Sequence, residues 1–400
     1  MAHTTLDRER IAMLTGALDR AYGPAVVSAP VEIVRAPGWV NLIGDHLDYN
    51  EGFMLPVAIE LDTWIAFRRR RDGCVRVVSR HSPEAGSFEI DAVEPARGGS
   101  AGGWSDYVAG MAWSLREAAI PIYGFDGVVD TTIPLGSGLS ASAALELASA
   151  LALLGGSRVL APPSLAALAQ RAEREFVGLD CGIVDQLASA AGRENKAMLL
   201  DCRSLDTRQV ALPFGVRVVV CDTGEKPELR ASTYNTRRAE CARAVALLAE
   251  RIPGLCSLRD LDAGSLRRYR AILPENVAAR AEHVVSENER VLAAVTALEA
   301  SDLDELSRIF AESHASARDL YAISSPALDT MVEIARSIPG VVAARMTGLG
   351  FGGCTVNLVL ADAVPALKAA VGRDYDRRTG LRGRVYPVAI VDGAGPIATD

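Results

Sequence analysis

Residues 134–144 read PLGSGLSASAA and stand between a predicted strand and a predicted helix. The strand covers Phe125–Ile133, and the apolar spacing from Ser142 to Leu154 is typical of a helix. Glycines let the backbone approach a ligand closely, and the helix behind them presents unpaired N–H groups and the positive end of its dipole. The sequence therefore predicts a site for phosphate oxygens, with the hydroxyls of Ser140 and Ser142 within reach of phosphate or magnesium.

Two well-known nucleotide-binding loops do not match this segment. The pattern GxxxxGK[ST] of a P-loop is absent. The loop also lacks the third glycine, and the acidic residue about 20 positions further on, that a dinucleotide-binding fingerprint needs. A tight turn leading into a capped helix explains the same residues. Taken alone, the loop leaves the function open.

Length and composition indicate a globular protein of two domains. The chain has 400 residues, of which 49% are apolar and 23% charged, with a net charge of −8. This length exceeds one ordinary core. The densest basic run, Arg68–Arg71, is better explained as the solvated end of a strand than as a nucleic-acid patch. We therefore expect no nucleic-acid partner.

The chain carries no sign of export or membrane insertion. Residues 1–8 lack the apolar core of a signal peptide, and the longest apolar stretch, Leu147–Leu154, is far shorter than the roughly 20 residues that span a bilayer. Seven cysteines without a CxxC pair are typical of reduced thiols, and five histidines without ligand spacing argue against structural zinc. We expect a cytoplasmic enzyme with no membrane partner.

The order of predicted elements favours an α+β fold over a doubly wound parallel sheet. In the first part the expected strands lie at 31–35, 62–69 and 74–80, and the expected helices at 105–119, 163–176 and 182–191. A strand-like run, Thr207–Asp222, begins the second part. It is followed by expected helices at 231–251, 276–299, 302–321, 325–338 and 364–371, and by strands at 341–346, 355–360 and 385–390. The predicted domains are residues 1–206 and 207–400.

Polar residues gather at two further places. Residues 35–52 read RAPGWVNLIGDHLDYNEG and bring Asp45, His46 and Asp48 together beside a turn. A sugar needs such a convergence of polar groups, because each buried unpaired hydroxyl costs about 1–3 kcal/mol. Asp185 lies in a predominantly apolar stretch, where an unpaired charge would be expensive to bury. Each acid taken singly could also be a turn residue, a helix cap or a salt-bridge partner.

Three segments together resemble the conserved motifs of the GHMP small-molecule kinases, the family of galactokinase, homoserine kinase, mevalonate kinase and phosphomevalonate kinase. Residues 35–52 look like the signature of the galactokinase branch, residues 134–144 like the phosphate loop, and residues 346–354 (MTGLGFGGC) like the C-terminal glycine loop. The likeness extends from about residue 31 to 391 through shorter matches at 172–173, 181–186, 200–205, 234–241 and 313–314.

The resemblance implies a two-domain GHMP kinase fold, with a ribosomal-protein-S5-domain-2-like N-terminal domain and a ferredoxin-like C-terminal domain. It implies ATP-dependent phosphorylation of the anomeric hydroxyl of a monosaccharide, D-galactose being the first candidate and galactose 1-phosphate the product. The implied cofactors are ATP and Mg²⁺. We expect a monomer or weak dimer whose partners are the sugar and ATP.

The resemblance also implies roles for individual residues. Asp185 is the catalytic base that accepts the proton of the anomeric hydroxyl. The residues that contact the sugar are Asp45, His46, Asp48, Gly182 and Tyr234. ATP is bound by Pro134, Gly136, Ser137, Gly138, Leu139, Ser140, Ala141 and Ser142. Magnesium is held by Glu173 and Ser142, and the loop that closes beside the phosphates contains Gly348, Gly350 and Gly352.

The clearest departure from the galactokinase pattern is Trp39, which stands where most members carry an arginine beside the catalytic aspartate. Leu47 also replaces the usual threonine, and Asp45 the usual glutamate. Tryptophan supplies no charge, and the loss of a nearby cation raises the pKa of Asp185. Three explanations stay open. Arg35 supplies the cation, or the pocket is rebuilt for another sugar with Trp39 stacking on it, or catalysis is feeble. The alternative functions are therefore a kinase for a different monosaccharide and a weakly active or inactive sugar- and ATP-binding sensor.

Overall fold

The computed structural model describes residues 5–24, 30–95, 103–134, 136, 138–156, 160–225 and 230–398. The strands are β1 (Glu32–Asn41), β2 (Phe53–Met54), β3 (Pro56–Arg70), β4 (Cys74–Ser79), β5 (Ser82–Glu89), β6 (Gly124–Thr131), β7 (Lys196–Asp201), β8 (Thr207–Ala211), β9 (Val216–Asp222), β10 (Val341–Thr347), β11 (Cys354–Leu360), β12 (Arg384–Val388) and β13 (Gly395–Ile397).

The helices are α1 (Thr5–Tyr22), α2 (Ser105–Glu117), α3 (Ala141–Leu153), α4 (Pro162–Arg171), α5 (Val184–Ala191), α6 (Arg230–Ala249), α7 (Ala263–Tyr269), α8 (Glu275–Ala300), α9 (Leu303–Asp319), α10 (Pro326–Arg336), α11 (Val364–Ala370) and α12 (Asp376–Thr379). None of the described helices combines the length and the apolar character needed to cross a bilayer.

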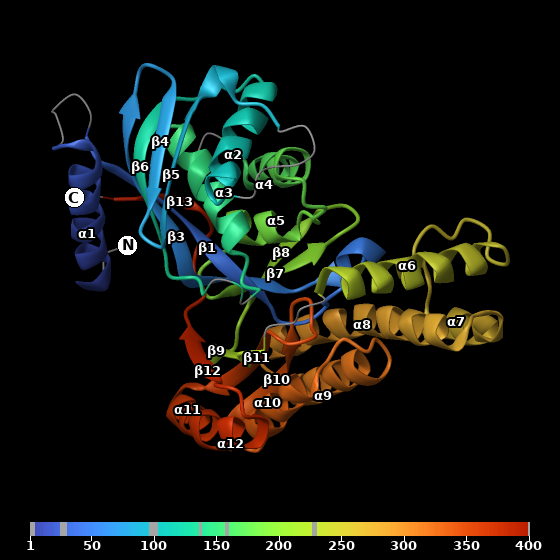
Figure 1. Ribbon diagram of the computed structural model, residues 1–400. Helices are drawn as coiled ribbons and strands as arrows, with labels where there is room; N and C mark the ends of the chain where they lie inside the picture. Colours follow the sequence, from blue (N-terminus) through green and yellow to red (C-terminus); the bar gives the residue numbers. More distant parts are fainter. Residues whose placement is uncertain are drawn as a thin grey trace.

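Figure 1 shows two lobes, an upper N-terminal lobe with α1–α5 and a lower C-terminal lobe with α8–α12. The N-terminal lobe contains a six-stranded sheet in the order β13-β1-β3-β6-β4-β5 and a three-stranded sheet, β2-β7-β8. Within the larger sheet β4 and β6 run parallel, and the other neighbouring strands are antiparallel. The last strand of the chain, β13, therefore returns to the N-terminal lobe.

Helices cover both faces of the six-stranded sheet because successive side chains of its central strands point to opposite faces. Trp64 and Ala66 of β3 pack in a cluster with Leu14 of α1, whereas Ile65 and Phe67 belong to the main core with α3. Helix α3 packs on β1, β3 and the neighbouring helices, and nearly all of its residues are buried. An apolar helix of this kind is stable only inside a core.

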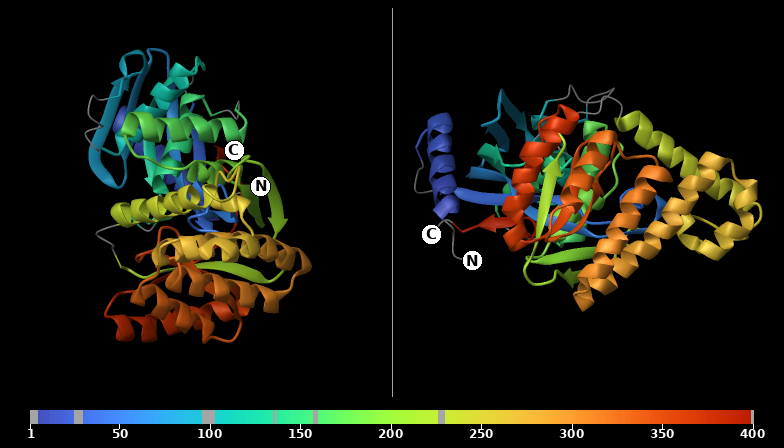
Figure 2. Two further views of the ribbon diagram at one scale, coloured as in Figure 1. Left: turned by 90° about the vertical axis from the view of Figure 1, so that its right-hand side faces the viewer. Right: turned by 90° about the horizontal axis from the view of Figure 1, so that it is seen from below.

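The C-terminal lobe is ferredoxin-like. Its sheet has the order β10-β11-β9-β12, all pairs are antiparallel, and helices lie between β9 and β10 and between β11 and β12. This is the β-α-β-β-α-β pattern, with additional helices in the first crossover. In the left view of Figure 2, α6 crosses at the level where the two lobes meet. The predicted α+β, two-domain architecture is confirmed.

One expected strand is divided between the lobes. The run Thr207–Asp222, predicted as a single strand-like segment, forms β8 and β9, separated by a turn at residues 212–215. Strand β8 pairs with β7 in the N-terminal lobe, and β9 is central in the C-terminal sheet. The turn contains Gly215, whose φ of +80° favours glycine. The prediction of one continuous strand is therefore wrong, and a boundary at residue 206/207 stays a prediction.

Candidate functional site

A cavity of about 750 Å³ lies between the two lobes. It is lined by the three segments that the sequence singled out, together with residues before α5 and at the start of α6. The predicted site residues on its wall are Trp39, Asp45, His46, Asp48, Pro134, Gly136, Gly138, Leu139, Ser140, Ala141, Ser142, Gly182, Asp185, Tyr234, Gly348, Gly350 and Gly352. Ser137 lies outside the described residues, and Glu173 does not line the cavity. Segments far apart in sequence thus meet at one cavity.

The phosphate loop leads from β6 into α3, as the sequence predicts. Gly136 and Gly138 have φ of +78° and +82°, a conformation that side chains rarely adopt. Ser140 also has a positive φ, +57°, directly before the first helical residue, Ala141. Ala141 and Ser142, in the first turn of α3, line the cavity. A helix terminus of this kind favours phosphate oxygens.

Asp185 lies in the first turn of α5 and is held by a hydroxyl from the phosphate loop. The Ser140 Oγ–H donates to Asp185 Oδ2 over 2.5 Å, and the Trp39 indole N–H donates to Ser140 Oγ over 2.8 Å. Burial raises the pKa of Asp185 to about 6, the Ser140 hydrogen bond lowers it, and the charges of Glu173 and Asp48 raise it further. A carboxyl with this pKa is ionised at neutral pH and accepts a proton more readily than an ordinary aspartate.

Arg35 does not stand in for the missing cation, so this explanation of Trp39 is wrong. Its guanidinium donates to Asp62 Oδ2 over 3.4 Å and to the carbonyl oxygen of Asp392 over 2.7 Å. No described cationic side chain is among the groups that shift the pKa of Asp185. Arg35 instead ties β1 to β3 and to the segment before β13.

Asp45 joins the sugar motif to the C-terminal lobe. Its Oδ1 accepts the N–H of Gly348 over 2.7 Å, and its Oδ2 pairs with the guanidinium of Arg345. Arg345, on β10, is only 1% exposed and also lies 3.6 Å from the carboxylate of Glu287, which is fully buried. Asp45 therefore lines the cavity while it fixes the first turn of the C-terminal glycine loop.

His46 adopts a positive φ of +63° and uses both ring nitrogens within the protein. The carbonyl oxygen of Leu349 lies 3.1 Å from Nε2, so Nε2 carries the proton. Burial lowers the pKa of His46, which keeps the ring neutral, and Nδ1 accepts from the hydroxyl of Tyr49 at 2.9 Å. Tyr49 in turn contacts the hydroxyl of Tyr321 at 2.7 Å. His46 thus links the sugar motif to the C-terminal glycine loop.

Asp48 and Tyr234 face each other on the wall of the cavity. The Tyr234 hydroxyl donates to Asp48 Oδ2 over 3.4 Å, and burial raises the pKa of Asp48. The backbone of Gly182 approaches the same carboxylate, since a Cβ at this position would lie 3.2 Å from Asp48 Oδ2. The predicted sugar contacts Asp48, Gly182 and Tyr234 therefore lie together.

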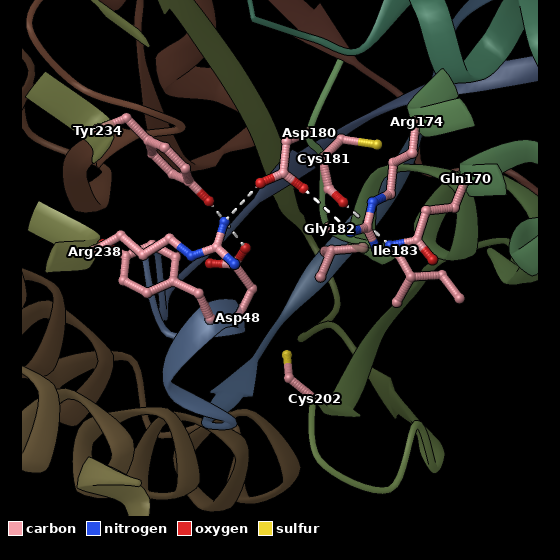
Figure 3. Close-up of a pocket in the computed structure, with 12 residues that line it drawn as sticks. Asp48, Gln170, Arg174, Asp180, Cys181, Gly182, Ile183, Cys202, Tyr234 and Arg238 are labelled. Carbon is pink, nitrogen blue, oxygen red and sulfur yellow. Dashed lines mark hydrogen bonds and ion pairs between the residues drawn. The ribbon is translucent and has the colours of Figure 1, made fainter. Parts of the chain in front are cut away.

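A smaller pocket of about 200 Å³ shares Asp48, Gly182 and Tyr234 with the main cavity. Figure 3 shows residues that line it. On its wall Asp180 pairs with two arginines, Arg238 of α6 at 3.0 Å and Arg174 at 3.4 Å. These ion pairs are more than half exposed, so each contributes little to stability. The Arg238 pair connects α6 to the segment before α5, and the Arg174 pair connects that segment to the turn that follows α4.

Glu173 lies behind the cavity wall in a π-helical turn, Ala172–Val177, that continues α4. Its carboxylate accepts the Gln186 Nε2–H over 2.6 Å, and the same nitrogen donates to Glu146 over 3.1 Å. Burial and the charge of Glu173 raise the pKa of Glu146 well above its usual range. No cluster of three or more His, Cys, Asp or Glu in the described part of the chain has the geometry to hold a metal ion.

The C-terminal glycine loop is a hairpin turn between β10 and β11, and one of its glycines is sterically indispensable. A Cβ on Gly350 would lie 2.2 Å from the carbonyl oxygen of Ile323, whereas a Cβ on Gly348 would meet nothing within 4 Å. Both glycines have a φ near +80°. We expect Gly350→Ala to lower the free energy of unfolding by at least 2 kcal/mol more than Gly348→Ala, an order-of-magnitude estimate for a backbone clash.

Chemical denaturation of the two variants measures this difference directly. Gly348→Ala is the matched control, because it introduces the same methyl group at nearly the same φ without the clash. Equal losses in the two variants would show that backbone strain alone determines the cost.

Two residues of the site escaped the sequence predictions. Arg345 lies in the apolar strand VVAARMT, and a charged residue in such a strand is a signal of a buried partner. Gln186 follows Asp185 and joins Glu173 to Glu146, but an uncharged amide carries no comparable signal.

Comparisons with known proteins agree with this arrangement. Family models match at residues 20–69 (galactokinase galactose-binding signature), 106–193 (GHMP kinases N-terminal domain) and 294–377 (GHMP kinases C-terminal). The chain is 43% identical to galactokinase of Roseiflexus sp. (strain RS-1), over 96% of this chain and 97% of the relative, and 44% identical to galactokinase of Chloroflexus aurantiacus, over 92% and 93%.

Solved structures show the same relationship. The structure of Lactococcus lactis galactokinase complexed with galactose matches with a TM-score of 0.89 and 34% identity, covering 97% of this chain and 100% of that one. The mevalonate kinase of Methanococcus jannaschii matches with a TM-score of 0.66 and 17% identity, covering 90% and 98%, and supports the fold alone.

Proposed function

This chain belongs to the galactokinase family of the GHMP kinases and is an ATP-binding sugar kinase, and from that premise we propose that its substrate is D-galactose and its product galactose 1-phosphate. The observation that carries the proposal is the position of Asp185. Its carboxyl group lies on the cavity wall between the phosphate loop and the sugar motif. A base at this place can reach a sugar hydroxyl that points toward ATP. The cytoplasmic location and the monomeric or weakly dimeric state stay predictions.

In the proposed reaction the anomeric oxygen of the sugar attacks the γ-phosphorus of ATP. Asp185 accepts the proton of that hydroxyl, the bond from the γ-phosphorus to the bridging oxygen breaks, and ADP leaves. Asp48, Gly182 and Tyr234 orient the sugar from one side, and Asp45 does so from the lobe junction. A positioned base contributes about 10²–10⁴-fold, so alignment and charge stabilisation supply the rest of the acceleration.

We propose that the loop residues Pro134, Gly136, Gly138, Leu139, Ser140 and Ala141 bind ATP, with Ser137 in the same role outside the described residues. Gly348, Gly350 and Gly352 approach the phosphates from the opposite lobe. The support is geometric, because both loops line the cavity and the N-terminus of α3 opens onto it. His46, with both ring nitrogens engaged, contributes by holding Leu349 of that second loop in place.

Glu173 and Ser142 are the residues that we propose to hold Mg²⁺. Glu173 is 6% exposed, and no described lysine or arginine pairs with it. The like charges of Glu173 and Asp185 raise the pKa of Glu146, so this corner of the lobe has an excess of negative charge that suits a divalent cation. Magnesium takes few protein oxygens and completes its coordination with phosphates and water. When bound, it supplies positive charge to the phosphoryl oxygens.

We expect kcat/KM for the sugar to fall in acid with a midpoint near pH 6. Asp185 has to be ionised to accept a proton, and burial raises its pKa to about 6. The rate therefore rises as the pH increases through this value and levels off above it. The measurement is kcat/KM for the sugar from pH 4.5 to 8.5, which reports ionisation of the enzyme before the sugar binds. A midpoint near pH 4, the ordinary range of an aspartate, would contradict the assignment.

ADP release from the purified protein with ATP, magnesium and a panel of free sugars tests the substrate. The panel contains galactose, 2-deoxygalactose, talose, glucose, mannose, arabinose, galacturonate and N-acetylgalactosamine. Rapid turnover on galactose is the expected result. Turnover on a different sugar alone would replace galactose as the substrate, and binding without turnover would favour a sensor.

A further inference from the structure

Trp39, Ser140 and Asp185 form a chain of two hydrogen bonds whose direction is fixed by chemistry. The indole N–H can only donate, so the 2.8 Å contact uses Ser140 Oγ as the acceptor. The single proton of the Ser140 hydroxyl is then free to donate to Asp185 Oδ2 over 2.5 Å. The partners are 101 and 45 residues apart, so the chain is a product of the tertiary fold.

The conformation of Ser140 is an independent sign of this arrangement. It precedes Ala141 at the N-terminus of α3, where a serine side chain commonly accepts a backbone N–H of the first turn. No such bond is present at this helix, and the residue has φ +57° and ψ +56°. A serine in the left-handed region is uncommon. The backbone thus turns the hydroxyl away from its own helix and toward the carboxylate of Asp185.

The surroundings of Asp185 explain why such a donor matters. Glu173 and Asp48, on two other segments, act on it with like charge, and burial acts in the same direction. Among the described groups that shift its pKa, the Ser140 hydroxyl alone favours the ionised form. The Trp39 side chain contributes no charge, but its indole N–H determines the direction in which the Ser140 hydroxyl donates its proton.

We propose that Trp39 and Ser140 are positioning residues for the transfer reaction, in which the indole N–H orients the serine hydroxyl and the hydroxyl holds Asp185 Oδ2, leaving Oδ1 for the sugar. The inference rests on the proposed role of Asp185 as the base. This proposal gives Trp39 a role that differs both from stacking on a sugar and from a loss of activity.

The test compares Ser140→Ala with Ser140→Gly. Both remove the hydroxyl, whereas only glycine relaxes the positive φ. We expect both variants to lose about tenfold in kcat/KM for the sugar at neutral pH, because the carboxyl is no longer held in place. We also expect the acidic midpoint of kcat/KM to move upward by about 1 pH unit, because the ionised carboxyl loses a hydrogen bond. If Ser140 only shaped the loop or contacted phosphate, the midpoint would stay in place in Ser140→Gly, and only its KM for ATP would change.

We call the two hydrogen bonds from Trp39 through Ser140 to Asp185 the relay. Trp39→Phe tests its first bond, since it keeps an aromatic ring and removes the N–H. We expect a smaller upward movement of the same midpoint with an unchanged KM for the sugar. The double variant Trp39→Phe/Ser140→Ala should match Ser140→Ala alone, because residues that act through one bond are not additive. Additive losses, or a changed sugar KM without a moved midpoint, would overturn the proposal.

Asp185→Asn separates this inference from the proposed function. Turnover retained in that variant would show that Asp185 is not the catalytic base, and the proposed relay would fail with it. Turnover lost in Asp185→Asn but an unmoved midpoint in both Ser140 variants would overturn the relay alone.

Discussion

Asp185→Asn is expected to lower kcat for sugar phosphorylation by about 10²–10⁴-fold. The amide has nearly the shape of the carboxyl but cannot accept the proton of the anomeric hydroxyl. ATP binding should be largely kept, because the amide oxygen can still accept the Ser140 hydroxyl and so leaves the phosphate loop in place. The measurement is steady-state ADP release, accompanied by a binding titration with ATP.

Asp130→Asn is the matched control for a buried aspartate of the same lobe. Asp130 is 4% exposed, pairs with Arg10 and Arg80, and does not line the cavity. This variant should lose stability while its folded fraction keeps the wild-type kcat. Similar kcat values for Asp185→Asn and the wild type would remove Asp185 from the catalytic role.

Arg345→Met should produce the largest loss of stability of any single change in the site. The guanidinium is 1% exposed, pairs with Asp45 and lies 3.6 Å from the carboxylate of Glu287. Arg345 and Arg290 both lower the pKa of Glu287, to about 2 against the effect of burial. Removal of Arg345 leaves Asp45 as a buried charge without its partner, which costs about 3–5 kcal/mol. Chemical denaturation measures this loss.

Two further variants make this result interpretable. Arg378 pairs with Glu333 at the surface, both side chains being more than 40% exposed, so Arg378→Met should cost at most about 1 kcal/mol. The double variant Arg345→Met/Asp45→Asn should recover part of the loss, because it also removes the charge left unpaired. A loss in Arg345→Met no larger than in Arg378→Met would contradict the account.

The sequence was most informative where local pattern and local structure coincide. The expected strand at 125–133 and helix at 142–154 correspond to β6 (Gly124–Thr131) and α3 (Ala141–Leu153), so the glycine loop was placed correctly between them. Apolar periodicity and glycine positions are properties of neighbouring residues, and they survive in the folded chain.

The pairing of strands from distant segments cannot be predicted from the sequence in the same way. Strand β13 pairs with β1, and β8 joins β7 instead of continuing into β9. Short strands carry little periodic signal, and their partners are chosen by burial in the complete fold. The division at residues 212–215 escaped prediction because a single apolar run can serve two sheets.

Side-chain networks were the least predictable part of the site. The sequence marks Trp39 as a departure, yet its bond to Ser140 depends on how strand β1 and the phosphate loop meet in the folded lobe. Likewise, the motif marked Asp45 as polar but gave no indication of Arg345, 300 residues away. Such contacts follow from tertiary geometry. A sequence pattern identifies the residues but does not show which of them pair.

The most direct test of the central claim is the ¹H-coupled ³¹P spectrum of the product formed from ATP, magnesium and galactose. Transfer to the anomeric hydroxyl predicts a phosphomonoester signal split into a doublet by the single anomeric proton, formed in step with ADP and absent with Asp185→Asn. A triplet from the two protons of C6, or inorganic phosphate as the only phosphorus product besides ADP, would contradict the account.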